Sequence, residues 1–301
     1  METLVEQVER LKRERDAVIL AHYYVSDEVQ AVADYVGDSY YLSKVATTVN
    51  QKTICLCGVQ FMGESAKLLN PEKRVIIPDA NADCPMAHMV DLDRINKVRA
   101  EYEDVAVVCY INSTATLKQY ADVCVTSANA KKVVESLPNK TIYFIPDEHL
   151  GRYIASQLPE KQFIFNDGFC HVHTSITADA VKKAKEARPK AKVLVHPECK
   201  QEVLELADYI GSTSGIIAYA TKSQEQEFLI CTEMGVFYEL NKKNPDKKFY
   251  SVGHRQFCPN MKLITLEKVI RCLQEESPLI EIDEEKAKQA RIPLERMLKL
   301  S

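Results

Sequence analysis

The sequence predicts an α/β protein made of three homologous domains, each a three-layer αβα unit with a short parallel sheet, related by pseudo-threefold symmetry. Two observations predict this. The phrase "ADYVGDS" at residues 33–39 returns as "ADVCVTS" at 121–127 and as "ADYIGSTS" at 207–214. The 301 residues of the chain also exceed the roughly 250–300 residues at which a single hydrophobic core stops growing.

The repetition extends well beyond that phrase. Two sets of landmark residues stand 88 and 86 residues apart, namely the aspartates Asp34, Asp122 and Asp208 and the prolines Pro71, Pro159 and Pro245. Agreement of both spacings at independent landmarks argues against chance resemblance between β-α elements. The period is also too long for solenoid repeats, which are ~20–50 residues. We therefore expect three complete domains.

Each unit contains three strand-like apolar runs separated by helical patterns. In chain order they are "AVILAHYY", "TICLCG" and "NPEKRVIIPD", then "VAVVCYIN", "TIYFIP" and "LPEKQFIFND", then "AKVLVHPE", "EFLICT" and "NPDKKFYSVG". Short apolar runs followed by helical patterns indicate β-α units, whose right-handed crossovers cover both faces of a parallel sheet. We expect domains at residues 1–87 (with an N-terminal helix), 88–174 and 175–301.

The segment beyond about residue 262 has no counterpart in the first two units. Its stretches "LEKVIRCLQE" and "EEKAKQARIPLERML" have the apolar spacing of amphipathic helices. We expect these two helices to pack on the outside of the protein.

The composition is that of an ordinary globular protein, with 46% apolar and 27% charged residues and a net charge of −4. A negative net charge argues against nucleic acid or an anionic membrane as the main partner. No apolar run approaches the ~18–20 residues of a membrane span. The charged amino terminus lacks the apolar core of a secretion signal, so we expect a cytoplasmic protein.

Ten cysteines are many for a reducing compartment, where disulfides rarely persist. Four of them stand in apolar runs and are expected to be core residues, because a free thiol packs as a small hydrophobe. These four are Cys55, Cys57, Cys109 and Cys124.

In each of the three units, one further cysteine follows the third strand. They are Cys84, Cys170 and Cys258, which stand 86 and 88 residues apart. Thiolates bind zinc, copper(I) or iron–sulfur clusters, and a structural zinc site uses four protein ligands. Three thiolates therefore favour a 4Fe-4S cluster in which one iron has no protein ligand and can act as a Lewis acid. The alternative is three loop cysteines with no shared role.

Polar side chains follow the first strand of each unit. One set of equivalent positions holds His22, Tyr110 and His196, and a second set, two residues later, holds Tyr24, Asn112 and Glu198. Ligands of open parallel sheets bind beyond the carboxyl ends of the strands. We therefore expect all six residues to face one active site at the shared axis of the three domains.

The repeated phrase ends in a hydroxyl in each unit, at Ser39, Ser127 and Thr213. Each hydroxyl precedes a helix-like segment, so N-capping alone could explain it. A helix N-terminus with a hydroxyl also binds anions, and three of them would hold a small molecule with several negative groups. The phosphate-binding motifs G-x-x-x-x-G-K-[ST] and G-x-G-x-x-G are absent. The residues thus predict an iron–sulfur enzyme that eliminates water or phosphate from a compact polyanion.

Ordered motifs along nearly the whole chain support a more specific hypothesis. They are "AHYY", "GDSYYLSKVA", "CGVQFMGESAKLLNP", "ADCPMA", "YINSTATLKQYADVCVTSANA", "PDEHLGRY", "VHPEC", "GSTSGI" and "CPNMK". By these motifs the chain resembles the quinolinate synthase family. The resemblance implies condensation of iminoaspartate with dihydroxyacetone phosphate, with loss of phosphate and two waters, to give quinolinate for NAD biosynthesis.

The resemblance also implies the site. Cys84, Cys170 and Cys258 would hold one 4Fe-4S cluster per chain, whose free iron meets the substrate. Substrate contacts are implied for His22, Ser39, Tyr110, Ile111, Asn112, Ser127, His173, His196, Pro197, Glu198 and Thr213. Some family members carry a C-x-x-C-x-x-C run near the last ligand, but this chain has only Cys258 in "FCPNMKL". We therefore expect the redox feature attached to that run to be absent.

Four residues are expected to be catalytic. Glu198 is the acid–base candidate with Tyr24 as its partner across the site, because condensation and dehydration both need proton transfers. His22 and His196 are expected to hydrogen-bond a substrate oxygen, with pKa values near neutrality.

Two further residues are candidates for lesser roles. His173, three residues after Cys170, is expected beside the cluster or against the substrate. Lys222 is a candidate phosphate contact, although an exposed lysine is the commoner case.

Two alternatives use the same cysteines. The diphthamide-forming radical enzymes also place one cysteine in each of three domains, and a non-enzymatic iron–sulfur sensor could do the same. The sensor hypothesis leaves the strand-end His, Tyr, Asn and Glu residues without a purpose. The expected partners are small polyanions (iminoaspartate and dihydroxyacetone phosphate), with the enzyme that supplies iminoaspartate as a further candidate.

Overall fold

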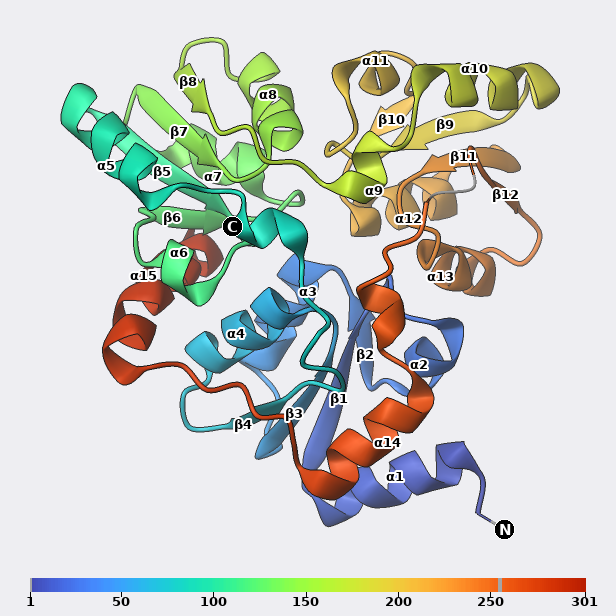
Figure 1. Cartoon of the computed structure of the whole chain (residues 1–301). Helices are drawn as coiled ribbons and strands as arrows, with labels where there is room; N and C mark the ends of the chain where they lie inside the picture. The colour runs from blue at the N-terminus through green and yellow to red at the C-terminus, as the bar shows by residue number, and fades with distance from the viewer. Residues whose placement is uncertain (1, 254–255) are drawn as a thin grey trace.

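The structure, a computed structural model, describes residues 2–253 and 256–301. It contains three four-stranded sheets with helices around them (Figure 1). The strand orders are β2-β1-β3-β4, β6-β5-β7-β8 and β10-β9-β11-β12, and every pairing is parallel. The same order therefore occurs three times, which confirms the predicted α/β fold with three short parallel sheets.

Each unit follows the same succession of helices and strands. The first comprises α1 Leu4–Glu14, β1 Ala17–His22, α2 Asp27–Val32, β2 Tyr35–Gly37, α3 Ser39–Ala46, β3 Thr53–Cys57, α4 Gln60–Leu69, β4 Arg74–Ile76 and the 3-10 turn η1 Pro85–His88. The second comprises α5 Leu92–Glu101, β5 Val105–Tyr110, α6 Ala115–Lys118, β6 Val123–Val125, α7 Ala130–Ser136, β7 Thr141–Ile145, α8 Glu148–Ser156, β8 Gln162–Phe165 and α9 His171–Thr174.

The third unit comprises α10 Ala178–Ala187, β9 Lys192–Val195, α11 Gln201–Leu204, β10 Tyr209–Ile210, α12 Thr213–Lys222, β11 Glu227–Cys231, α13 Val236–Lys243, β12 Lys248–Ser251 and η2 Met261–Leu263. Two helices then complete the chain, α14 Leu266–Glu275 and α15 Glu284–Leu300.

The first half of the repeated phrase has a structural function that the sequence analysis did not anticipate. In each unit the carboxylate of the phrase's aspartate accepts a hydrogen bond from a backbone N–H in the first strand. These bonds join Asp34 to Ile19 at 2.8 Å, Asp122 to Val107 at 2.7 Å and Asp208 to Val193 at 2.8 Å. The residues after each aspartate form the short edge strand β2, β6 or β10. The aspartate therefore fixes the edge strand against its neighbour.

The core is divided unequally. Buried apolar side chains of the first two sheets form one continuous cluster, which also takes in α14 and α15. The third sheet packs within two smaller clusters. The two C-terminal helices are amphipathic as predicted, but they do not cover the third unit. Helix α14 packs on α1 and β3, and α15 contacts β6, α6 and α4 of the first and second units (Figure 1).

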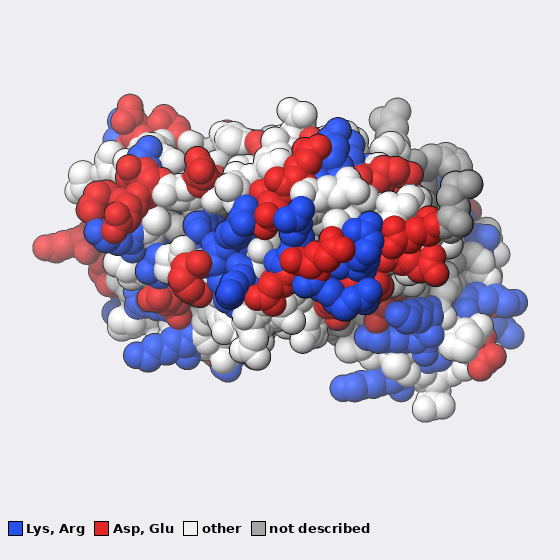
Figure 2. All heavy atoms as spheres, turned by 90° about the horizontal axis from the view of Figure 1, so that it is seen from below, with Lys and Arg blue, Asp and Glu red and all other residues white. Residues whose placement is uncertain are grey.

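The surface carries both signs of charge close together. Over the face drawn in Figure 2, below α1 and α14, lysine and arginine side chains alternate with aspartate and glutamate, and no continuous basic patch covers that face. Among the described residues, no helix combines the length and the apolar character that crossing a membrane would require.

The packing of α15 predicts a stability difference between two neighbouring residues. Leu294 is fully buried, whereas Ile292 on the same helix is 62% exposed. Leu294→Ala should lower the free energy of unfolding by about 2–5 kcal/mol, because it removes buried methyl groups and leaves a cavity. Ile292→Ala should change it by less than about 0.5 kcal/mol. Urea unfolding of both variants measures the difference, and equal losses would show that α15 does not contribute to the core.

Candidate active site

Side chains from all three units line one cavity. It brings together thirteen of the residues expected at the site: His22, Tyr24, Ser39, Cys84, Tyr110, Asn112, Ser127, Cys170, His173, His196, Glu198, Thr213 and Cys258. Ile111 and Pro197 are buried but do not line it. Ile111 instead lines a smaller adjoining cavity.

Lys222 does not reach the cavity. It is exposed at the last residue of α12, whose first residue, Thr213, lines the cavity. Nine residues of helix separate the two, roughly 14 Å at 1.5 Å per residue. Lys222 is therefore the exposed lysine that is the commoner case, and it does not contact a phosphate in this site.

The three hydroxyls lie in the cavity, and none of them caps its helix. Asp38 caps α3 through the Tyr41 N–H, and Ser212 caps α12 through the Gly215 N–H. Ser39 and Thr213 are thus the first residues within their helices, which begin at the cavity. For Ser39 and Thr213 the conflict between capping and ligand binding does not arise, because the preceding residue does the capping. Ser127 lies two residues before Asn129, the N-cap residue of α7, which makes no side-chain capping bond.

His22 and His196 share one local arrangement at the ends of their strands. Nδ1 of His22 accepts the Tyr24 N–H at 3.1 Å, and Nδ1 of His196 accepts the Glu198 N–H at 3.3 Å. Burial lowers the pKa of both imidazoles to about 3, so the expectation of pKa values near neutrality is wrong. At neutral pH both rings are neutral with the proton on Nε2. In His196 this N–H points to the Ser127 hydroxyl at 3.2 Å.

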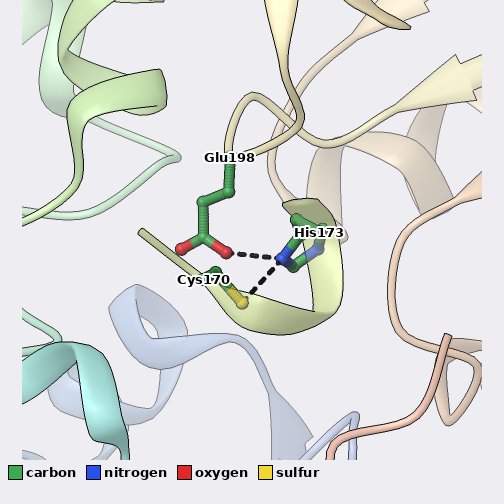
Figure 3. A group of neighbouring side chains, drawn as sticks. All are labelled: Cys170, His173 and Glu198. Carbon is green, nitrogen blue, oxygen red and sulfur yellow. Dashed lines mark hydrogen bonds and ion pairs between the residues drawn. The ribbon is translucent and has the colours of Figure 1, made fainter. Parts of the chain in front are cut away.

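Glu198 lies within a compact group with His173 and Cys170 (Figure 3). Cys170 and His173 belong to the short segment at α9, and Glu198 reaches them from the loop after β9. Nδ1 of His173 lies 2.6 Å from the Glu198 carboxylate and 3.2 Å from the Cys170 sulfur. Burial alone would raise the pKa of Glu198, but His173, together with His196 and Tyr110, outweighs it and holds that pKa at about 2. Glu198 is therefore a buried carboxylate at neutral pH.

Tyr24 connects the first unit to the third. Its hydroxyl lies 2.7 Å from the Thr213 hydroxyl and 2.8 Å from the Thr232 hydroxyl. Thr232 in turn lies 2.9 Å from Nε2 of His173. Burial and the charge of Glu198 raise the pKa of Tyr24 well above its ordinary value, so the phenol stays protonated. A chain of hydrogen bonds thus joins Tyr24, Thr232, His173 and Glu198.

The three predicted ligand cysteines are half-buried, while the other seven are fully buried. The expectation that Cys55, Cys57, Cys109 and Cys124 are core residues is confirmed.

Burial, with the neighbouring Cys258 and Glu198, raises the pKa of Cys84 to about 12. Burial, Glu198 and Cys84 raise that of Cys170, and burial raises that of Cys258. These thiols therefore affect one another's ionisation, and a bound cation would favour their thiolate forms.

The sequence analysis missed several residues that line the cavity: Asp38, Tyr40, Val59, Phe61, Thr126, Val172, Glu233 and Met261. Two of these residues are acidic, Asp38 and Glu233, and Glu233 is completely inaccessible to solvent. A signal for it existed, because Asp147 stands 86 residues earlier at the same place after its strand. The first unit has Val59 at that position, so the pattern is broken.

Comparisons with known proteins identify the family. A family model described as quinolinate synthetase A protein matches residues 6–299. The chain is 51% identical to the quinolinate synthase of Fusobacterium nucleatum over 98% of this chain and 99% of the relative. It is 48% identical to those of Caldicellulosiruptor saccharolyticus (100% and 99% covered) and Clostridioides difficile (99% and 98% covered). The resemblance seen in the sequence is thereby confirmed, and this chain belongs to the quinolinate synthetase A protein family, a family of biosynthetic enzymes.

Proposed function

We propose that this enzyme condenses iminoaspartate with dihydroxyacetone phosphate, releasing phosphate and two waters, to form quinolinate for de novo NAD biosynthesis. One observation carries the proposal. A single cavity collects one half-buried cysteine from each unit together with the strand-end His, Tyr, Asn and Glu side chains. Relatives that match the full chain are named quinolinate synthase, which supports the same activity.

Cys84, Cys170 and Cys258 would hold the 4Fe-4S cluster, and the iron that no cysteine binds would supply a Lewis acid for a substrate oxygen. The donor set fits this group. Among the described residues, only Cys170, His173 and Glu198 place ligand atoms within 4.8 Å of one another, the spacing that one ion needs. The three cysteines line the cavity without forming such a group, which supports a larger cluster over one shared ion.

The cavity offers donors for a substrate with several negative groups. Ser39, Ser127 and Thr213 supply hydroxyls, and α3 and α12 begin at the cavity, where a helix N-terminus favours anions. His22 and His196 would donate from Nε2 to substrate oxygens, as neutral rings whose charge does not change on binding.

Asn112 provides an acceptor. Its side-chain oxygen is buried and has no hydrogen-bond partner among the described residues. A buried acceptor left unpaired costs about 1–3 kcal/mol. A substrate N–H or O–H would satisfy it.

Glu198 is the proton acceptor in this proposal. It is ionised at neutral pH, it lines the cavity, and it is held by His173 Nδ1 at 2.6 Å. The hydrogen bond fixes the direction of the carboxylate and leaves its second oxygen free of His173. Tyr24, which stays protonated, would serve as a donor on the opposite side of the hydrogen-bonded chain.

The proposal includes the domain organisation and the compartment. Residues 1–87, 88–174 and 175–301 would be three domains arranged with pseudo-threefold symmetry around the cavity, a division supported by the threefold repetition of strand order. The proposed compartment is the cytoplasm. All ten cysteines are free thiols, as is usual in a reducing compartment, and this supports the proposal. Neither the diphthamide-type enzyme nor the sensor is favoured, because the relatives that match nearly the whole chain are all named quinolinate synthase.

An anaerobic assay tests the activity directly. Purified protein reconstituted with iron and sulfide should form quinolinate from iminoaspartate and dihydroxyacetone phosphate. Omitting either substrate should abolish the product. A fully reconstituted protein that forms none would overturn the proposal.

Substitution of the ligand cysteines should remove the cluster. Cys84→Ser, Cys170→Ser and Cys258→Ser should each abolish stable binding of iron and sulfide and the activity, because a serine hydroxyl is a poor ligand for soft iron–sulfur centres. Cys124→Ser, in the core, is the control and should affect mainly stability. Iron and sulfide analysis after reconstitution decides, and a normal iron content in any one of the three variants would remove that cysteine from the ligand set.

Two variants should affect proton transfer and substrate binding separately. Glu198→Gln keeps the shape but cannot accept the proton, so turnover should fall by ~10²-fold or more while substrate binding is nearly retained. Ser127→Ala should instead weaken binding, because a hydrogen bond to a charged partner is worth about 1.5–3 kcal/mol. Steady-state kinetics and substrate titration distinguish them. If Glu198→Gln turns over at the wild-type rate, the proton passes to another group, with His196 and Tyr24 the first candidates.

The low pKa of the buried histidines predicts an acid-sensitive fold. Unfolded histidine titrates near 6.5, whereas His22 and His196 in the fold titrate at about 3, so between these values the unfolded chain binds more protons. Stability should therefore fall as the pH drops below 6.5, by up to ~1.4 kcal/mol per pH unit for each ring. Urea unfolding between pH 7 and 5 should show a shallower loss for His22→Gln. An identical slope would mean that His22 is not buried as a neutral ring.

A further inference from the structure

A buried carboxylate holds the backbone of one ligand cysteine. Glu233 follows β11 and is completely inaccessible to solvent. Its Oε1 accepts the backbone N–H of Cys258 at 3.0 Å and lies 3.1 Å from the Lys262 ammonium. Its Oε2 accepts the Gly235 N–H at 2.6 Å. The carboxylate therefore ties the end of β11 to the loop that carries Cys258.

Lys262 extends this connection to the first unit. Its ammonium donates to the backbone carbonyl of Tyr24 at 2.7 Å, as well as pairing with Glu233. The two units approach closely at this point, because a Cβ at Gly235 would lie only 2.5 Å from the Tyr23 carbonyl oxygen. Gln30 also donates to the Gly235 carbonyl at 3.0 Å. One ion pair thus contacts the backbones of a ligand cysteine and of a cavity tyrosine.

We infer that Glu233 and Lys262 are positioning residues that hold Cys258 and Tyr24 in a fixed relation across the first and third units. The inference rests on the proposed function in one respect, namely that Cys258 is a cluster ligand. Neither residue needs to touch the substrate for this role. Glu233 acts through the Cys258 amide, and Lys262 acts through Glu233 and the Tyr24 carbonyl.

A contribution to the stability of the fold does not by itself explain why Glu233 and Lys262 form an ion pair here. Removing the Glu233 charge from water is costly, and its partner Lys262 is still 29% exposed, so the pair gains little net stability over apolar side chains of similar volume. What apolar side chains cannot supply is charge-assisted hydrogen bonding to a chosen backbone amide and carbonyl. Directional contacts of this kind fix geometry, and a cluster site needs fixed ligand geometry.

The other ligand cysteines have carboxylates beside their backbones as well. The N–H of Cys84 donates to Asp83 at 2.7 Å, within the same loop. Asp147, at the position in the second unit that matches Glu233, is buried, and burial and the charge of Glu198 raise its pKa well above the ordinary value, against a smaller opposing effect of the Leu150 and Cys170 amides. The first unit has Val59 at that position, and Asp83 takes over the contact. In the first and third units a carboxylate from a different position in the unit thus accepts the backbone N–H of the ligand cysteine.

The experiment compares Lys262→Met with Lys262→Arg, and adds Glu233→Gln. Lys243→Met, which breaks the exposed pair with Glu239 in the same unit, is the matched control. Each protein is reconstituted anaerobically with iron and sulfide, and the rate of iron release to an excess of chelator is measured. Circular dichroism melts establish that each variant is folded.

Glu233→Gln and Lys262→Met should release iron about 10- to 100-fold faster than wild type, the range that one charge-assisted hydrogen bond supplies. Lys262→Arg keeps the charge and the donors, and should restore a release rate close to that of wild type and of Lys243→Met. A role in stability alone would lower the melting temperature and leave the release rate of the folded protein unchanged, and that result would overturn the inference.

Failure of the proposed function gives a different result. If the wild-type protein takes up no iron and sulfide, the cluster assignment fails, and Cys258 is not a ligand. If the wild type loads normally and Glu233→Gln and Lys262→Met both release iron at its rate, the assignment stands and the positioning role of this pair is wrong.

Discussion

One buried negative charge acts together with burial to keep the tyrosines and one ligand cysteine of the cavity protonated. Glu198 is almost inaccessible to solvent, yet it remains a carboxylate because His173 lies 2.6 Å away. Its charge contributes to raising the pKa of Tyr24, Tyr110 and Cys84. Burial and this charge together hold the phenols and the thiol protonated, so the Glu198 carboxylate faces several neutral donors in the cavity. A substrate oxygen that gains negative charge would meet donors, and a proton that must leave would meet Glu198.

The spacing of equivalent positions was enough to predict most of the residues in the cavity, for a physical reason. Parallel strands with one repeated order place their carboxyl ends at corresponding points, so residues such as His22 and His196 occupy corresponding places whatever their local surroundings. The pKa values could not be predicted in this way. They depend on how completely each ring is buried, and that depends on packing between units, which no spacing reports. The role of Lys222 could not be decided from the sequence, and the structure places it away from the cavity because the length of α12 separates it from Thr213.

The edge strands and the helix caps escaped prediction for a related reason. Strands β2, β6 and β10 have two or three residues each, too few for a period of two to be recognised. Each is set in place by a side chain, as when Asp34 accepts the Ile19 N–H, and not by its own apolar pattern. Glu233 escaped because its counterpart in the first unit is Val59. A carboxylate that accepts a backbone N–H from a neighbouring loop can be replaced by a carboxylate at another position. Comparing equivalent positions in the three units therefore does not reveal such a residue.

The third unit is joined to the first unit in a different way from the second unit. Apolar packing merges the first two sheets into one core, whereas the third keeps its own clusters, with Tyr23 inserted into one of them. Directional contacts also cross this boundary, among them Tyr24 with Thr213 and Thr232, Lys262 with the Tyr24 carbonyl, and Gln30 with the Gly235 carbonyl. Apolar contacts tolerate small displacements, but hydrogen bonds weaken steeply with distance and angle. The boundary that brings Cys258 to the other two cysteines is therefore held in part by geometrically demanding contacts. Because those contacts involve cavity residues, the position of the third unit and the geometry of the site depend on the same side chains.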